Sequence, residues 1–403
     1  MWKFCLLVFF PFLSQGVAQE TRKERNQKEV SKNIIQEWEK AGAKYSADPM
    51  PTFFFATWEK GVLSKLPNPD APFRLVQNEI GDTGLEELSS FNNLNAIMLG
   101  KTKIRKDGFK HLSHLKNLNH LNLFGFGIGF TDEMARHISQ VKSLTSINLG
   151  MSDLTNDGLK ILTGLHKLSR LDLVATGITD EGAKEFGKFK KLTHLNVGLT
   201  KITVNELMKV PEVRNLKILM LGGDNGGITD ADLKLLSEIK GLTCLNLLGS
   251  DRATSAGLKE IAKLKELRQL RLSNVLIKDK LNKEVGLKEI ARNQNLTHLV
   301  VEGIETTVTN IDLRSISKLK NLQYLYVESA LITDEGLSEL GGLENLTNLY
   351  LVNTQIPTEA DMEIRKRLPK CKVITIAPKT YERFFEVVVN FWFPFGEDYK
   401  KFW

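Results

Sequence analysis

Seven residues between positions 271 and 350 carry side chains suited to holding a ligand. Aromatic and Arg side chains contribute a disproportionate share of the binding energy in protein interfaces. Tyrosine also combines a flat apolar ring with a hydroxyl that forms hydrogen bonds, which suits both sugars and peptides. We therefore predict a binding site for a protein or glycan partner at Arg271, His298, Glu302, Tyr324, Tyr326, Glu328 and Tyr350.

Catalytic chemistry is not indicated by the remaining polar residues. His194 and Asp172 fall on neighbouring predicted strands but diagonally to each other, and no Ser or Cys at the same level completes a nucleophilic set. His120, His194 and His298 are too far apart along the chain's repeats to share one metal ion. We expect no enzymatic activity, no metal site and no cofactor.

The elements that position these residues follow from one repeated unit, seen in its regular form between Leu322 and Asn345. Apolar residues at positions 1, 4 and 6 of the unit alternate, which predicts a strand, and those at 16, 19 and 22 recur every three residues, which predicts a helix. Thr333 and Asp334 stand between the two, where oxygen-bearing side chains can cap the first helical turn.

The unit recurs about twelve times at a spacing of mostly 24 residues, a period typical of leucine-rich repeats. Position 4 is assigned to Phe73, Ile97, Leu121, Ile147, Leu171, Leu195, Leu219, Leu245, Leu270, Leu299, Leu325 and Leu349. We predict an α/β leucine-rich-repeat solenoid over residues 73–377, a right-handed horseshoe with a parallel β-sheet on its concave face and helices on its convex face. Positions 3, 5 and 7 should face the concave side.

Several phrases in the repeats carry a more specific resemblance: GITDEGA at Gly177 to Ala183, GITDADL at Gly227 to Leu233, LITDEGL at Leu331 to Leu337, and LPKC at Leu368 to Cys371. They resemble the Ile-Thr-Asp repeats of secreted bacterial proteins and are similar to the cysteine-containing repeats of F-box proteins. The resemblance implies a binding scaffold and leaves the partner open, because such scaffolds bind unrelated molecules. No F-box-like helical segment is recognised before the repeats, which argues against a ubiquitin-ligase adaptor.

Two cysteines lie within the repeats. Cys244 and Cys371 are predicted to lie five strands apart, roughly 24 Å at the usual strand spacing, which is beyond the reach of a disulfide. Cys371 occupies a leucine position and is expected in the core, whereas Cys244 is expected on the concave face.

Five repeats are longer than 24 residues, each between its strand and its helix, in the regions 125–130, 222–227, 250–255, 274–285 and 302–307. Four of these are consecutive and should form a ridge beside the concave face, and such insertions often mark the binding side. The alternative is that the insertions are surface loops that the fold tolerates and that have no role in binding.

The two ends of the chain differ from the repeats. Residues 1–18 resemble a secretory signal peptide, which predicts a secreted or periplasmic (cell-envelope) location. Residues 19–72 should form an N-terminal capping helix, near Ile34 to Trp38, and an irregular lead-in. Residues 378–403 are aromatic-rich and predict a C-terminal cap, or a tail that contacts a partner or the membrane surface.

The formal net charge of +7 is modest for 403 residues, and the Lys and Arg residues lie mostly between the apolar positions of the predicted helices. We expect no nucleic-acid partner, because no basic run is interleaved with aromatic residues. The sequence thus predicts a non-enzymatic binding scaffold that uses its concave face. The alternatives are a structural envelope component held by its aromatic tail and, less favoured, a ubiquitin-ligase adaptor.

Overall fold

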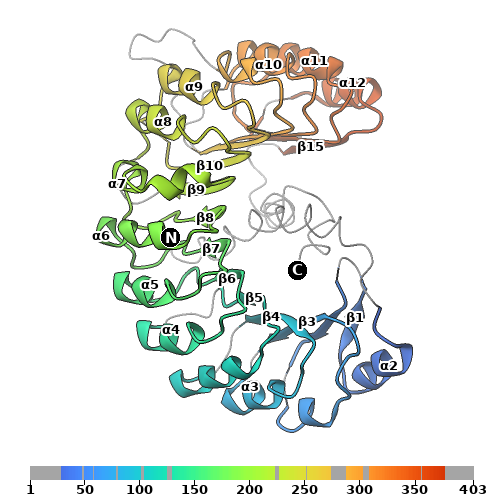
Figure 1. The fold of residues 1–403 in the computed structure, drawn as a ribbon. Helices are drawn as coiled ribbons and strands as arrows, with labels where there is room; N and C mark the ends of the chain where they lie inside the picture. The colour runs from blue at the N-terminus through green and yellow to red at the C-terminus, as the bar shows by residue number, and fades with distance from the viewer. Residues whose placement is uncertain are drawn as a thin grey trace. The chain divides into compact units, whose positions relative to one another are not determined.

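The computed structural model describes residues 29–47, 50–57, 59–78, 80–100, 104–124, 129–222, 227–250, 252–273, 287–302, 308–354 and 356–376. Strands and helices alternate along these residues (Figure 1), and the chain divides into two compact units, one before and one after the boundary between Asn196 and Val197. In each unit the strands are ordered as in the sequence, so the predicted solenoid of strand–turn–helix repeats is confirmed.

The first unit contains a sheet in which β1 is antiparallel to β2 and every later strand is parallel to its predecessor. Its strands are β1 (Lys44–Ser46), β2 (Thr52–Phe55), β3 (Phe73–Asn78), β4 (Leu94–Gly100), β5 (His120–Asn122), β6 (Ser146–Asn148), β7 (Arg170–Asp172) and β8 (His194–Asn196). Its helices are α2 (Lys32–Lys40), η3 (Leu63–Lys65), α3 (Asp82–Leu88), η4 (Lys106–His114), α4 (Asp132–Ile138), α5 (Asn156–Leu162), α6 (Asp180–Ala183) and η5 (Lys184–Lys188), where η marks a 3₁₀-helix.

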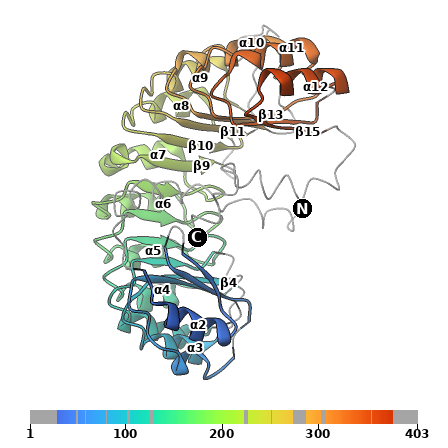
Figure 2. The same cartoon turned by 90° about the vertical axis from the view of Figure 1, so that its right-hand side faces the viewer.

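The second unit has an all-parallel sheet. Its strands are β9 (Ile218–Gly222), β10 (Cys244–Leu248), β11 (Gln269–Ser273), β12 (His298–Glu302), β13 (Tyr324–Glu328), β14 (Asn348–Val352) and β15 (Lys372–Ile376). Its helices are α7 (Val204–Met208), η6 (Pro211–Asn215), α8 (Asp230–Leu236), α9 (Ser255–Ile261), η7 (Ile290–Arg292), α10 (Asn310–Ile316), α11 (Asp334–Glu339), η8 (Leu340–Gly342) and α12 (Thr358–Arg367). Helices α8–α12 cover one face of this sheet (Figure 2).

The register of the first repeat differs from the prediction. Leu75, and not Phe73, pairs with Ile97 and so occupies position 4, because the pairing of β3 with β4 shifts between Phe73 and Arg74. The alternation of apolar residues could not distinguish the two, since both side chains are fully buried on the same face of β3. The sheet also extends before residue 73, because β2 pairs in parallel with β3.

A helix occupies the place where an N-terminal cap is predicted. The indole of Trp38 in α2 is fully buried and packs against Phe53, Phe73 and Phe91 at ring-centroid distances of 4.3, 5.6 and 5.3 Å. Its Nε1 donates a hydrogen bond to the carbonyl oxygen of Pro67 at 2.9 Å. Through these aromatic contacts α2 covers the apolar core of the first repeats.

Asparagine and aspartate side chains explain why β5, β6 and β7 are only three residues long. The side-chain oxygens of Asn122, Asn148 and Asp172 each accept a hydrogen bond from the backbone N–H two residues further on, at 2.9, 2.9 and 3.1 Å. Such a local turn competes with continued strand pairing. Strands β9–β15, in which this position is mostly apolar, aromatic or Arg, all run for five residues.

Neighbouring repeats are tied together by the Thr-Asp part of the repeated phrase. Asp132, the first residue of α4, accepts hydrogen bonds from the backbone N–H and the hydroxyl of Thr155 in the next repeat, at 2.8 and 2.5 Å. Asp230 accepts the same pair from Thr254, both at 2.7 Å. Thr155 and Thr254 each cap their own helix, by accepting a hydrogen bond from the backbone N–H of Asp157 or Ala256, and also anchor the preceding repeat.

Candidate functional site

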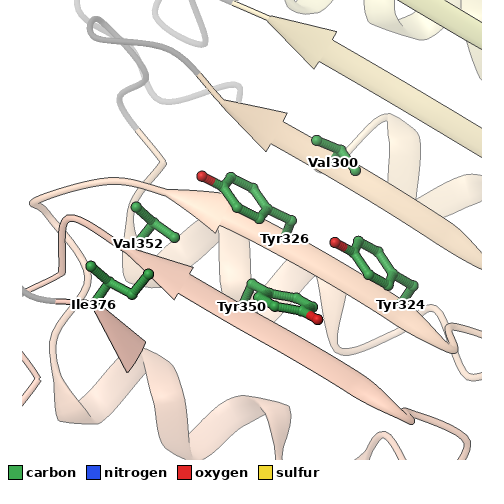
Figure 3. Close-up of a cluster of buried hydrophobic side chains, with 6 residues drawn as sticks. All are labelled: Val300, Tyr324, Tyr326, Tyr350, Val352 and Ile376. Carbon is green, nitrogen blue, oxygen red and sulfur yellow. The ribbon is translucent and has the colours of Figure 1, made fainter. Parts of the chain in front are cut away.

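Three tyrosines lie close together on one face of the second unit's sheet. Tyr324 and Tyr326 come from β13 and Tyr350 from β14, where Tyr326 pairs with Tyr350 in the strand register. The ring centroids are 5.4 Å apart for Tyr324 and Tyr350 and 6.3 Å apart for Tyr326 and Tyr350. Figure 3 shows the three rings on the same side of the strands.

Aliphatic residues from the adjoining strands complete the cluster. We use the name tyrosine patch for Val300, Tyr324, Tyr326, Tyr350, Val352 and Ile376, which form one hydrophobic cluster with Ile374 packed against it. These side chains occupy positions that alternate with those of the leucine core, and they lie on the sheet face opposite α10–α12 (Figures 2 and 3). The patch is therefore an apolar cluster separate from the leucine core.

A buried ion pair borders the patch. The Nε of Arg271 in β11 donates to Oε1 of Glu302 at 2.7 Å, and the Ser273 hydroxyl donates to the same oxygen at 2.8 Å. The Nη2 of Arg271 also lies against this carboxylate. The side chains of Arg271 and Glu302 are only 3% and 12% exposed, so the pair is held largely away from water.

The two tyrosines of β13 and the neighbouring His298 are held in their neutral forms. Burial raises the pKa of Tyr324 and of Tyr326 well above the ordinary value for a phenol, so both hydroxyls remain protonated. Burial lowers the pKa of His298 to about 4. Its neutral imidazole stacks on the Tyr324 ring with 5.8 Å between centroids.

The structure brings the seven predicted site residues to one region of one sheet. They lie on β11 to β14 and are joined by the contacts of Arg271 with Glu302 and of Tyr324 with His298 and Tyr350. Arg271 and the three tyrosines are at most 2% exposed, whereas Glu328 is half-buried at the end of β13. Their role in binding stays a prediction.

Sequence reasoning missed the aliphatic half of the patch. Val300, Val352, Ile374 and Ile376 fall at positions 5 and 7, where the register turns them toward the tyrosines. The sequence does contain a clue to the patch at these positions, because a solvent-facing strand position is ordinarily polar and here it is aliphatic.

Asp172 and His194 do not form a catalytic pair in this structure. Asp172 accepts hydrogen bonds from Asn196 Nδ2 at 3.0 Å and from the Val174 backbone, and Nδ1 of His194 lies 2.8 Å from the hydroxyl of Thr193. Burial raises the pKa of Asp172 to about 7 and lowers that of His194 to about 3. Within the described ranges, no group of three or more His, Cys, Asp or Glu side chains could hold a metal ion.

Both repeat cysteines are free thiols, as the predicted strand separation requires. Cys244 is buried, and burial raises the pKa of its thiol well above the ordinary value. The prediction that Cys371 lies in the core was wrong, because it is partly exposed in the turn before β15.

Most of the inserted loop residues, the signal peptide and the aromatic C-terminal tail lie outside the described residues. Of the helices that the structure describes, none is both long enough and apolar enough to span a membrane.

Comparison with known proteins supports the repeat assignment. A family model described as Leucine Rich repeat matches residues 164–187. The chain folds as a leucine-rich-repeat solenoid. The solved structure of an internalin from Listeria monocytogenes resembles it with a TM-score of 0.51 and 20% sequence identity, over 80% of this chain and 85% of the internalin.

A leucine-rich-repeat protein from Leptospira interrogans is also similar, with a TM-score of 0.44 and 19% identity over 86% of this chain and 100% of that protein. None of the curated proteins compared matches the sequence. At 20% identity the internalin structure supports the solenoid fold and indicates nothing of the partners of this chain.

Proposed function

We propose that this leucine-rich-repeat protein is a non-enzymatic scaffold that binds another protein through the tyrosine patch and the charged residues at its edge. The observation that carries the proposal is the apolar cluster on the sheet face opposite the helices. A sheet face away from the helical layer is ordinarily polar, so an apolar cluster on this face departs from the usual pattern and calls for a packing partner.

The composition of the patch favours a protein partner over a glycan. Tyrosine suits both classes, but Val352, Ile374 and Ile376 on β14 and β15 give one end of the cluster a purely aliphatic character. Aliphatic side chains favour apolar peptide segments, because sugar hydroxyls would lose their hydrogen bonds to water against them. Glu302 and Glu328, at the ends of β12 and β13, place acidic groups at the edge of the patch.

The test of this proposal removes two rings and leaves the ion pair intact. In a chain carrying Tyr326→Ala and Tyr350→Ala, capture of a partner protein from the envelope extract of the producing cells should fall at least tenfold, since interface aromatics often contribute about 2 kcal/mol or more each. Capture is measured by quantitative mass spectrometry on immobilised protein.

The matched control is Tyr45→Ala in the first unit, where a tyrosine ring packs 5.1 Å from Phe53 far from the patch in sequence. This variant should capture the partner as the natural chain does. Circular dichroism confirms that each variant is folded. Equal capture by the natural chain and the double variant would refute the site.

The proposal includes a secreted or periplasmic location, which rests on the signal-like residues 1–18 and on the resemblance of the repeats to those of secreted bacterial proteins. The mass of the mature protein tests it directly. A chain that begins near Gln19 is expected, and a chain that retains residues 1–18 would contradict secretion by this route.

A further inference from the structure

The tyrosine patch is shielded from water above the sheet as well as along it. Tyr324, Tyr326 and Tyr350 are 2%, 1% and 1% exposed, and Val300 and Val352 are 4% and 3% exposed. Side chains on one face of a sheet cover one another at their sides, and their outer ends stay open to water unless a second layer packs about 10 Å away. Burial this complete therefore implies a layer of atoms over the patch.

The helical layer of the second unit is not this cover. Helices α8–α12 lie against the other face of the sheet, where they bury the leucine core (Figure 2). The three tyrosine rings stand on the face that is shown in Figure 3. The cover is therefore distinct from the helices of the repeats.

The chain passes out of the described residues at the patch itself. Ile376, the last residue of β15, belongs to the patch, and residues 377–403 follow it. Neighbouring strands lie about 4.8 Å apart, so β13 is about 10 Å from β15, and about four extended residues span that distance. Residues beyond about position 380 can therefore reach every ring of the patch.

The residues that follow have the composition of a covering layer. We use the name aromatic segment for residues 379–395. Four of its apolar residues recur at the i, i+3, i+4, i+7 spacing that gives a helix one apolar face: Tyr381, Phe384, Phe385 and Val388. Four more aromatic residues lie within positions 391–395. Such rings bury large apolar areas and pack well against other rings.

We propose that the aromatic segment packs on the tyrosine patch of the same chain and that the partner protein must displace it. Tethering beside the patch gives the segment an effective concentration on the order of millimolar, an advantage that a separate molecule lacks. The contact is independent of the proposed function, whereas the competition rests on it. Tyr326→Ala with Tyr350→Ala still lowers capture, because losing two anchor rings weakens the partner more than release of the segment helps it.

The contact is tested by photo-crosslinking within the purified full-length chain. A photoreactive phenylalanine analogue is placed at Phe385, the dilute protein is irradiated, and products of single-chain mass are digested with trypsin. The expected product joins position 385 to the tryptic peptide 321–365, which contains all three tyrosines. Fragmentation of this product by mass spectrometry should place the link on β13 or β14.

Two backgrounds control the crosslink. Tyr326→Ala with Tyr350→Ala should lower the yield of the 321–365 product at least tenfold, because the surface that the segment meets is lost. Tyr45→Ala, in the first unit, should leave the yield unchanged. The contact is overturned if the product is absent, if it joins only other parts of the chain, or if it joins a second chain.

The competition is tested with Phe384→Asp and Phe385→Asp together in the full-length chain. Two charges on the apolar positions should release the segment, because a carboxylate does not bury against an apolar cluster without cost. Capture of the partner protein from the envelope extract of the producing cells should then rise about tenfold, since the binding-competent form is more populated.

Arg383→Gln with Asn390→Asp is the matched control, because it changes the charge by the same amount at positions that the helical spacing places away from the apolar stripe. It should leave capture unchanged. Equal capture by the natural chain and the two-aspartate variant refutes the competition, and the crosslink decides the contact separately. Absence of capture by every chain refutes the proposed function and leaves the crosslink as the test of the contact.

Discussion

Replacing Arg271 by Met lowers the free energy of unfolding by about 3–5 kcal/mol, the expected cost of removing one member of a buried ion pair. The substitution leaves the Glu302 carboxylate beside the tyrosine patch with the Ser273 hydroxyl but without its cation. Because Glu302 is only 12% exposed, water cannot fully replace the guanidinium. Equilibrium denaturation in urea measures the change.

Two further variants isolate the cause. In Arg271→Met combined with Glu302→Met, most of the lost stability should return, because the uncompensated charge is gone and the new side chains are apolar. Arg105→Met, which breaks the ion pair of an 87% exposed arginine with Asp82, should lower the free energy of unfolding far less than Arg271→Met does. The account fails if Arg271→Met costs no more than Arg105→Met.

Replacing Gly158 by Ala should lower the free energy of unfolding by about 2–3 kcal/mol, as overpacking does in a well-filled site. A Cβ at Gly158 would lie 2.2 Å from Oδ1 of Asp132 and 2.4 Å from Cδ1 of Leu154. Asp132 cannot move away freely, because its carboxylate accepts the two hydrogen bonds from Thr155. The melting temperature and urea denaturation report the loss.

The control lies in the same repeat. Gly164→Ala places its Cβ 3.2 Å from Nζ of Lys142, the mobile end of a long side chain, and should change stability by less than about 0.5 kcal/mol, the range of ordinary surface substitutions. Asp132→Ala combined with Gly158→Ala should cost clearly less than the sum of the two single variants. Strict additivity would show that the two residues do not meet.

The period of the apolar residues was sufficient to predict the fold, because leucines such as Leu171 and Leu325 occur at spacings that only stacked strand–turn–helix units bury together. The role of Gly158 was not predictable, since it depends on Asp132, a residue 26 positions earlier that approaches only when the repeats stack. The assignment of position 4 in the first repeat to Phe73 was wrong for a similar reason. Phe73 and Leu75 are equally apolar, and the irregular pairing of β3 with β4 decides between them.

The candidate site was predicted in part. Residue type and position placed Tyr324, Tyr326 and Tyr350 on one face, and the structure confirms that they are neighbours. The sequence did not indicate that these rings are almost fully buried, because burial depends on which groups pack around them in space.

Site-directed photo-crosslinking tests the central claim most directly. A photoreactive amino acid is placed at Asn348, which pairs with Tyr324 beside the patch, and in a second chain at Lys366, an exposed residue of α12 on the opposite face. Binding through the patch predicts a crosslinked partner protein from Asn348 and little or none from Lys366, with the Asn348 product lost in the Tyr326→Ala, Tyr350→Ala background. Crosslinking from Lys366 alone, or from Asn348 unchanged by the two substitutions, would contradict the assignment.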